Sequence, residues 1–458
     1  MKFDSKELLE TVAARSIRYL ANLDARCVSP SHNALRALAQ FSELLPPGPT
    51  NPNETLALLD EVGSPATVAT AGGRYFGFVT GGSLPVALAA NWLAGAWDQN
   101  SALVAMSPVG AALEEVALQW LVEIFGLPRG TGAGFVTGAT MANFTALAAA
   151  RHAVLEQSGW DVDADGLFGA PPISVVVGEE VHVSLLKALG MLGLGRNRVL
   201  RVPADNQGRM RADALPRWDG PAILCIQAGN VNSGAFDPAE PIIAAAKKAG
   251  AWIHVDGAFG LWAAASPKLH HLLNGFEAAH SWAVDAHKWL NVPYDSGIAF
   301  VREPRHLRKA MAINASYFEP GSKREPDQHT PEMSRRARGV EIWAALRTLG
   351  CAGVADLVER ACRFAAFFAE RLRKAGCEIL NEVVLNQVLV AFGDDETTRR
   401  VIADLQEDGT CWCGETVWHG RAAMRISVSS WATTEQDVER SLEAILRVAS
   451  IQGSLARK

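Results

Sequence analysis

Two apolar runs that each lead into chemically reactive residues constrain this chain more than any other feature. Residues 251–255 form one such run, and Asp256 follows it directly. Residues 282–284 form the next, after an expected intervening helix, and Lys288 lies just beyond it. Short apolar runs of this kind are typical of buried strands. Ligands bind beyond the carboxyl ends of the strands in an open α/β sheet, so we expect Asp256 and Lys288 to share one crevice.

An acid and a lysine in one crevice are the pair that pyridoxal phosphate requires. The lysine forms the covalent link to the cofactor, and the acid partners the ring nitrogen. An anion beside that nitrogen favours its protonated form, which lets the ring accept electrons from the substrate α-carbon. A desolvated pocket would lower the pKa of Lys288 toward its neutral, nucleophilic form. Taken alone, the two residues also fit a plainer interpretation, a strand-end Asp256 and a surface Lys288.

The residues that flank this pair carry a more specific signal. The stretches His-Val-Asp-Gly-Ala at 254–258 and Asp-Ala-His-Lys-Trp-Leu at 285–290 resemble the group II pyridoxal-dependent amino-acid decarboxylases, which include aromatic amino-acid, glutamate and cysteine-sulfinate decarboxylases. The resemblance covers most of the chain from Arg74 onward. It implies an α/β fold of the aspartate-aminotransferase type (fold type I), with a mostly parallel sheet in a large domain and a small C-terminal α/β domain. It also implies a homodimer with a shared active site.

Composition agrees with a globular enzyme. The chain has 458 residues, of which 49% are hydrophobic and 20% charged, enough for two or three domains. A net charge of −6 gives no reason to expect nucleic acid as a partner. The seven cysteines include no CxxC pair, and we interpret Cys411 and Cys413 as strand residues, so no metal site is predicted. Scattered thiols, no signal core and no membrane-length apolar run predict a cytoplasmic protein without membrane contact.

The pattern of helices and linkers predicts three segments. Apolar residues at helical spacing in 5–22 predict a first helix, and the proline-rich stretch 46–52 marks a linker. This N-terminal part has too little apolar surface for a core of its own. We therefore predict an N-terminal helical segment that packs on the partner subunit, a large cofactor-binding domain and a small C-terminal domain, at residues 1–72, 73–338 and 339–458.

A strand that runs into a turn of small residues predicts a phosphate site. The turn at Gly138, Ala139 and Thr140 is followed by an apolar helix. Small residues let a phosphate approach backbone N–H groups, and a helix N-terminus adds positive potential. We predict these three residues as the phosphate cup, with Thr140 as both donor and helix cap. The glycines of 130–134 are not a dinucleotide fingerprint, because they precede the strand.

Further cofactor contacts follow from the family resemblance. His182 stands where the family places a histidine that stacks on the cofactor ring and helps to position the substrate. Gln227 stands where related enzymes often carry threonine, so its hydrogen bond to the cofactor is expected to differ. Ser296 is placed to reach the phosphate from the neighbouring subunit's side. The remaining predicted cofactor contacts, all close to the central pair, are Ala258, Asp285 and His287.

The polar stretch 314–338 is predicted to be an exposed catalytic loop. Its Tyr317 matches, in an Ala-Ser-Tyr context, a tyrosine that the family places on a lid, where it is thought to protonate the α-carbon after carbon dioxide leaves. On the substrate side, the resemblance points to Phe78 and Thr80 as pocket residues and to Asn100 in a segment lent to the neighbouring site. It also places Arg425 near the substrate carboxylate.

The predicted function is therefore decarboxylation of an L-amino acid to its amine, by a carboxy-lyase of amino-acid metabolism. An aromatic or bulky apolar substrate is favoured by four aromatic residues, Phe76, Phe78, Trp412 and Trp418. Arg425 and the loop arginines equally fit an acidic substrate. Decarboxylation-coupled oxidation to an aldehyde is disfavoured by the presence of Tyr317. Transamination and carbon–carbon cleavage are disfavoured by the motifs, and an inert dimer kept as a binding protein is disfavoured because Lys288 and Asp256 are both present.

Overall fold

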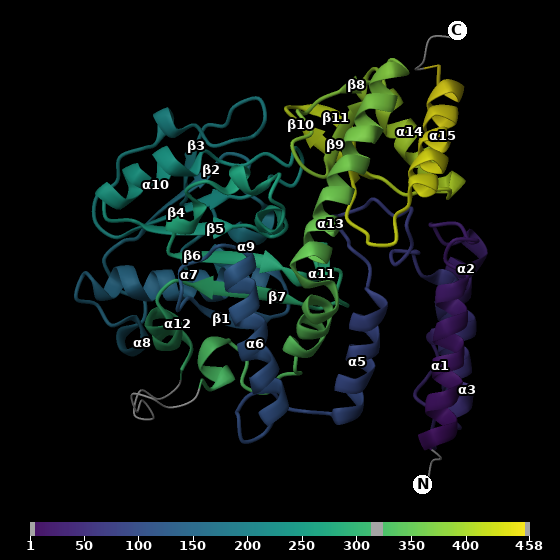
Figure 1. Cartoon of the computed structure of the whole chain (residues 1–458), viewed down its shortest axis with the longest axis horizontal. Coiled ribbons are helices and arrows are strands. Elements are labelled where there is room, and N and C mark those ends of the chain that lie inside the picture. Colours follow the sequence, from purple (N-terminus) through teal and green to yellow (C-terminus); the bar gives the residue numbers. More distant parts are fainter. Residues whose placement is uncertain (1–4, 313–323, 454–458) are drawn as a thin grey trace. The chain divides into compact units, whose positions relative to one another are not determined.

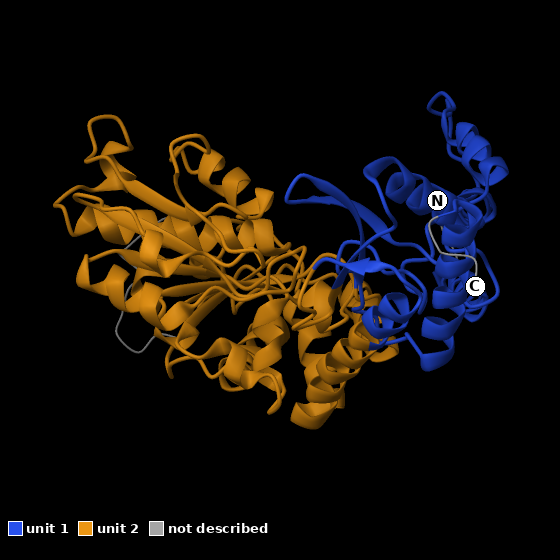
Figure 2. Ribbon diagram, turned by 90° about the horizontal axis from the view of Figure 1, so that it is seen from above, with its two compact units in different colours: residues 1–80, 367–380, 388–458 blue, residues 81–366, 381–387 orange. Residues whose placement is uncertain are grey.

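The structure is a computed structural model that describes residues 5–312 and 324–453. Contacts divide the chain into two compact units, which Figure 2 colours separately. Unit 1 comprises residues 1–80, 367–380 and 388–458, and unit 2 comprises residues 81–366 and 381–387. The three-segment division predicted from the sequence remains a proposal.

A seven-stranded sheet forms the centre of unit 2, with strand order β1-β7-β6-β5-β4-β2-β3 (Figure 1). The pairs from β3 to β6 are parallel, whereas β7 runs antiparallel to both of its neighbours. This is the predicted mostly parallel sheet, and the parallel strands point their carboxyl ends to one edge. The strands are β1 (Gly132–Val136), β2 (Ser174–Gly178), β3 (Leu200–Val202), β4 (Ala222–Gln227), β5 (Trp252–Asp256), β6 (Ser281–Asp285) and β7 (Gly297–Val301).

Helix α7 (Ala139–Glu156) is the central helix of this unit. It contacts β4, β5, β6 and β7 as well as β1. The buried residues of α7 include seven alanines. Because these side chains are small, the backbone of the helix can approach the strands closely. The other α-helices of this unit are α5 (Pro85–Trp97), α6 (Pro108–Ile124), α8 (Val162–Asp165), α9 (Val183–Met191), α10 (Ala239–Lys248), α11 (Ala286–Trp289), α12 (Pro304–Met311) and the first part of α13 (Gly339–Lys374).

The connection between β5 and β6 differs from the single helix expected there. It consists of the 3-10 helices η4 (Gly260–Ala265), η5 (His270–Leu273) and η6 (Phe276–Ala278). Pro267 lies between η4 and η5, and Gly275, with φ of 88°, lies between η5 and η6; both residues prevent one continuous helix. Further 3-10 turns of this unit are η3 (Ala212–Ala214) and η8 (Pro326–His329).

Unit 1 contains the N-terminal helices and a four-stranded sheet of order β10-β11-β9-β8. The first helix, α1, contacts α3 and has no fully buried residue. The elements are α1 (Ser5–Ala21), α2 (His32–Ala37), η1 (Leu38–Phe41), α3 (Pro52–Leu58), η2 (Leu59–Gly63), α4 (Ser64–Ala66), the end of α13, β8 (Glu378–Ile379), β9 (Gln387–Ala391), α14 (Asp395–Asp408), β10 (Gly414–Trp418), β11 (Arg421–Ser427) and α15 (Glu435–Ile451).

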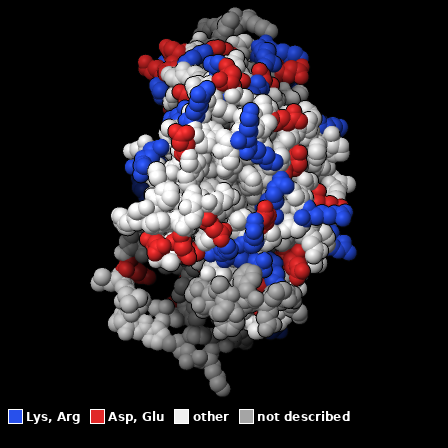
Figure 3. Space-filling view, turned by 90° about the vertical axis from the view of Figure 1, so that its left-hand side faces the viewer, with Lys and Arg blue, Asp and Glu red and all other residues white. Residues whose placement is uncertain are grey.

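The surface agrees with the charge balance of the sequence. Figure 3 shows positive and negative side chains interspersed over the face that it displays. All seven cysteines are free. Within residues 5–312 and 324–453, no helix has the length and apolarity needed to cross a membrane.

Candidate active site

The carboxyl ends of β5 and β6 bring the predicted pair to one edge of the sheet. Asp256 ends β5, is 5% exposed, and pairs in register with Ala283 of β6. The segment after β5 is joined to β6 by hydrogen bonds, from Gly257 N–H to the Ala283 carbonyl (2.9 Å) and from Asp285 N–H to the Ala258 carbonyl (2.8 Å). The sheet therefore delivers Asp256 and the Asp285–Lys288 stretch side by side, as predicted.

Lys288 lies in α11, immediately after β6. Its Nζ is 2.9 Å from Asp285 Oδ2, and its side chain is 17% exposed. The same ammonium lies 5.9 Å from the centre of the Phe259 ring. The other carboxylate oxygen, Asp285 Oδ1, accepts the backbone N–H of Ala139 at 2.5 Å. Asp285 thus joins the lysine to the small-residue turn.

His287 orients Asp285 from the other side. Its Nδ1 accepts the Ser296 N–H (3.1 Å), so Nε2 carries the proton and faces Asp285 Oδ1 at 3.4 Å. The ring also stacks on Tyr294, with 4.3 Å between ring centres. Burial lowers the pKa of His287, although Asp285 acts in the opposite direction. His287 is therefore neutral, with its Nε2–H close to the Asp285 carboxylate.

The turn at Gly138 is closely packed, and it differs from the prediction in one respect. Gly138 is the N-cap of α7 and Thr140 lies in its first turn, so the predicted capping by Thr140 is wrong. The Asp285 carboxylate, bound to Ala139 N–H, takes the role of a cap. A Cβ atom on Gly297 would lie 2.5 Å from Gly138 Cα, and one on Gly138 would lie 3.0 Å from His287 Cε1.

His182 and Gln227 lie on two loops that are tied together. His182 is the half-buried N-cap of α9, and its Nδ1 accepts the Ser184 N–H at 3.2 Å. Gln227 ends β4 in register with Asp256, and its amide donates to the Glu180 carbonyl at 3.1 Å. The Gln227 N–H donates to buried Asp237, whose pKa is raised to about 6 by burial.

These residues fit pyridoxal phosphate. The first turn of α7 offers backbone N–H groups at a helix N-terminus, where phosphate binds well. Ser296 is 3% exposed, and its hydroxyl has no hydrogen-bond partner among the described residues. A partly exposed lysine and a buried carboxylate complete the donor set at the same sheet edge.

The predicted substrate residues Phe78, Thr80 and Arg425 belong to unit 1. Phe78 is 63% exposed, and its ring lies 5.4 Å from that of half-buried Trp412. Thr80 is buried, and so is Arg425 on β11, whose pKa is lowered by desolvation. Two other aromatic residues, Phe76 and Trp418, are 0% and 3% exposed. They are core residues, so only Phe78 and Trp412 support an aromatic pocket.

Of the two remaining predicted site residues, Asn100 is among the described residues and Tyr317 is not. Asn100 Oδ1 accepts the N–H groups of Ala102 and Arg335, and its amide donates to Ser334. These contacts tie the Asn100 segment to the loop before α13. Tyr317 lies outside the described residues.

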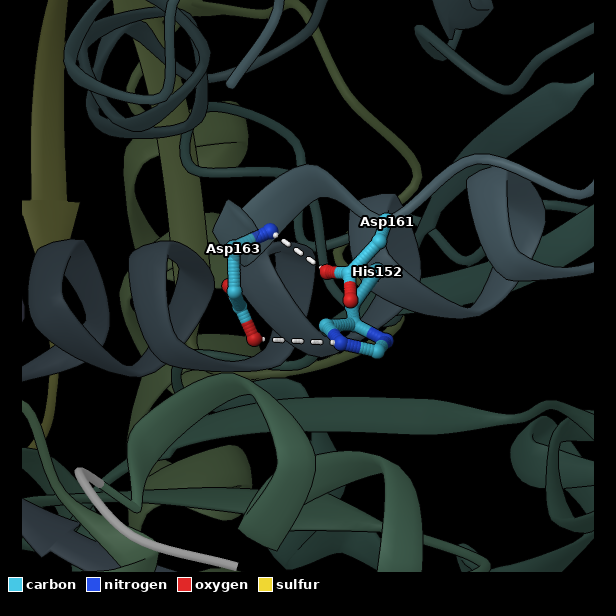
Figure 4. A group of neighbouring side chains, drawn as sticks. All are labelled: His152, Asp161 and Asp163. Carbon is cyan, nitrogen blue, oxygen red and sulfur yellow. Dashed lines mark hydrogen bonds and ion pairs between the residues drawn. The ribbon is translucent and has the colours of Figure 1, made fainter. Parts of the chain in front are cut away.

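One group of described residues has the chemistry of metal ligands, but it lies away from this edge. His152 at the end of α7 and Asp161 and Asp163 at α8 place ligand atoms within 4.8 Å of one another (Figure 4). Asp161 caps α8 by accepting the Asp163 and Ala164 N–H groups, and Asp163 Oδ2 lies 3.2 Å from His152 Nε2. Capping and pairing account for these contacts, and we propose no metal site there.

The sequence analysis missed the polar residues behind Asp256. Asn143 of α7 donates to Asp256 Oδ2 at 3.3 Å, and its Oδ1 lies 2.8 Å from His254 Nε2. Both residues are completely buried. The available signal was an asparagine within an alanine-rich helix and a histidine within an apolar strand, since such residues need buried polar partners.

Comparisons with known proteins agree with this site. A family model described as the pyridoxal-dependent decarboxylase conserved domain matches residues 67–393. Tryptophan decarboxylase 1 of Oryza sativa subsp. japonica is 26% identical over 82% of this chain and 80% of its own length. An acidic amino acid decarboxylase of Bos taurus is 28% identical over 68% of this chain and 61% of its own length.

A solved structure shows the same fold. The crystal structure of Oryza sativa TDC with PLP and tryptamine superposes with a TM-score of 0.89 and 22% identity, covering 98% of each chain. The fold is thus that of fold type I decarboxylases, as predicted. Because the family model spans well over half of the chain, this protein belongs to the pyridoxal-dependent decarboxylase family and is a carboxy-lyase that uses pyridoxal 5′-phosphate to decarboxylate an amino acid.

Proposed function

We propose that the substrate is an aromatic L-amino acid, which the enzyme converts to its amine and carbon dioxide. The observation that carries this choice is the exposed ring of Phe78 beside Trp412, which offers an aromatic surface to a flat side chain. The similarity to a tryptophan decarboxylase supports it. An acidic substrate is the second candidate, favoured by the buried guanidinium of Arg425 and by the acidic amino acid decarboxylase relative.

The roles of the cofactor residues follow from their chemistry. When bound, pyridoxal phosphate supplies a protonated ring that withdraws electrons from the substrate α-carbon. We assign the covalent attachment to Lys288 and the charge partner of the ring nitrogen to Asp256. We assign binding of the cofactor phosphate to the Gly138–Thr140 turn and Ser296. His287 and Asp285 hold the lysine beside this turn, while Ala258, Gln227 and His182 shape the wall formed by the neighbouring loops.

The substrate side is assigned by resemblance. Tyr317 delivers the proton to the α-carbon, so the product is an amine instead of an aldehyde. Phe78 and Thr80 line the side-chain pocket, and Arg425 binds the substrate carboxylate. Asn100 positions its segment at the site of the partner subunit, which makes the homodimer part of the proposal.

The attachment site is tested by reduction. Borohydride treatment of the cofactor-loaded enzyme should fix the label on the peptide that contains Lys288, as seen by mass spectrometry. Lys288→Ala should abolish turnover. Lys187→Ala, a lysine change on α9, is the matched control and should leave labelling intact. Label on another lysine, or wild-type activity in Lys288→Ala, would refute the assignment.

The substrate class is tested with a panel of amino acids, in which carbon dioxide, amine and oxygen consumption are measured together. The highest kcat/KM should be for an aromatic amino acid, with one amine per carbon dioxide and no oxygen consumed. Phe78→Ala should lower that kcat/KM by about tenfold, one ring contact of about 1.4 kcal/mol. Phe168→Ala, which alters a 99% exposed phenylalanine elsewhere, is the control. Preference for glutamate or aspartate would favour the second candidate.

A further inference from the structure

A row of buried polar side chains runs from Asp256 along β5 and β6. Asn143 donates to Asp256 Oδ2 (3.3 Å) and lies 2.8 Å from His254 Nε2. His254 Nδ1 lies 2.9 Å from Ser281 Oγ, and Trp252 Nε1 donates to the same oxygen at 2.9 Å. The exposed fractions of these five residues range from 0% to 6%. No water is needed to connect them.

The chemistry of the groups fixes the direction of every hydrogen bond. The Asn143 amide faces Asp256 with its NH₂ group, because its oxygen there would oppose another acceptor. Asn143 Oδ1 must then accept, so His254 Nε2 carries a proton. Burial lowers the pKa of His254 to about 3, so the ring is neutral and Nδ1 accepts from the Ser281 hydroxyl. The Ser281 oxygen accepts in turn from Trp252, whose Nε1 can only donate.

Every donor in this chain therefore points toward the Asp256 carboxylate. Aligned hydrogen bonds polarise one another, and their effect is larger in a water-free interior. Hydrogen bonds donated to a buried carboxylate hold it in one position. The second carboxylate oxygen accepts the Ala258 N–H at 3.3 Å, which also fixes the orientation of the group. Cys225 on β4 interacts with Asp256, but burial raises the pKa of this thiol, so it remains uncharged.

We propose that Asn143, His254 and Ser281 are positioning residues that hold the Asp256 carboxylate in place, aimed at the ring nitrogen of bound pyridoxal phosphate. The proposal rests on the proposed role of Asp256 and extends it. A carboxylate buried at this depth needs polar support, and these hydrogen-bonded residues supply it from the interior of the unit. The three residues act through Asp256 and need not touch substrate or cofactor.

The test uses the apo-protein and two cofactors that differ in one atom. Pyridoxal 5′-phosphate has a ring nitrogen that an anion stabilises, whereas its 1-deaza analogue has a C–H group there. The ratio of the two dissociation constants, measured by fluorescence quenching, reports the interaction of Asp256 with the ring nitrogen independently of turnover. The wild type should prefer the natural cofactor, and Asp256→Asn should lose that preference.

Asn143→Ala and His254→Phe should each reduce the preference about tenfold, because Asp256 loses a buried hydrogen bond that holds its carboxylate in place. Ser281→Ala, the smallest change, should reduce it less. His254→Gln, which can donate to Asn143 again, should recover most of it. Thr145→Val, a similar change to another fully buried polar residue of α7, is the matched control and should keep the wild-type ratio.

The outcomes separate the two levels of the argument. If the wild type shows no preference, or Asp256→Asn keeps it, the proposed role of Asp256 fails. Suppose instead that the wild type prefers the natural cofactor and that Asn143→Ala, His254→Phe and Ser281→Ala keep the same preference. The positioning role is then refuted, and the hydrogen bonds among these residues serve only the stability of the fold. Thermal melting followed by circular dichroism first checks that each variant is folded. If Asn143→Ala and His254→Phe unfold the protein, the positioning role is decided by Ser281→Ala and by the recovery of the preference in Ser281→Thr. A loss of preference in Thr145→Val also would refute a specific role.

Discussion

At the scale of single residues, burial holds several histidines of unit 2 in their neutral form. Desolvation lowers the pKa of His254 and His329 to about 3 and that of His280 to about 4. Nearby arginines add to this effect for His329 and His280. Each of these histidines binds a proton near pH 6.5 in the unfolded chain, but only at a much lower pH in the folded chain. These residues make the fold sensitive to acid.

The sign and size of this effect are testable at His329. Its folded pKa lies below the unfolded value of 6.5, so stability is complete above pH 6.5 and decreases as the pH falls toward 3. Between pH 7 and pH 5 the loss should be about 2 kcal/mol for this residue. His329→Gln should remove that part of the pH dependence in urea unfolding. His271→Gln, a change to a surface histidine, is the control, and equal slopes in all three proteins would contradict the account.

At the scale of elements, the segment before α5 clamps the turn that carries Lys288. Leu84 N–H donates to the Asn291 carbonyl at 2.7 Å. Asn291 has φ of 55°, and its amide donates to the carbonyls of Lys288 (3.3 Å) and Trp289 (2.9 Å). A Cβ atom on Gly81 would lie only 1.8 Å from the Lys288 carbonyl oxygen. The absence of a side chain at Gly81 is therefore what lets the two segments meet.

Gly81→Ala should push the Lys288 backbone away from its position. Overpacking of a tight backbone contact costs about 1–3 kcal/mol, and we expect the affinity for pyridoxal phosphate to fall at least about tenfold. Gly190→Ala is the matched control, because a Cβ atom at that helical glycine meets nothing within 4 Å. Cofactor titration of the apo-proteins provides the measurement. Unchanged affinity in Gly81→Ala would show that the clamp has no influence on the lysine.

At the scale of the whole molecule, exposed apolar side chains gather on particular helices. On α1, Leu9 and Ile17 are 64% and 62% exposed, and on α5, Trp92 and Leu93 are 44% and 55% exposed. Large apolar side chains exposed on a helix are candidates for an interface. These four side chains are therefore not covered by other residues of their own units. They support the proposed homodimer, with an isologous two-fold interface.

Sedimentation velocity should show a particle of twice the 49.0 kDa chain mass. Leu9→Asp combined with Ile17→Asp should shift the protein toward the monomer, because a charge in an apolar interface is left unpaired. Val417→Asp, which changes a 56% exposed valine on β10, should leave the dimer intact. A stable, fully active monomer of the wild type would overturn the shared site.

The sequence by itself predicted the buried strands at the centre of the fold and the residues proposed for the central chemistry. Apolar runs of strand length gave β5 and β6, and the polar residues after them gave Asp256 and Lys288, because a local pattern reports which residues end a buried strand. The small-residue turn before α7 was legible for the same reason. Helix ends were harder: Thr140 was expected to cap α7, yet the cap position is Gly138. A distant carboxylate, Asp285, binds that helix end, and no local pattern encodes it.

Only the tertiary structure decided which polar residues support the site and which aromatic residues are accessible. Asn143 and His254 are 111 residues apart in sequence, and their contact exists because α7 packs on β5. Phe76 and Phe78 look alike in the sequence, but one is buried and the other is 63% exposed. Burial and long-range hydrogen bonds depend on how elements pack, which is a property of the whole chain. Local sequence patterns could name the proposed catalytic pair, whereas only the packing of the chain could show the residues that support Asp256.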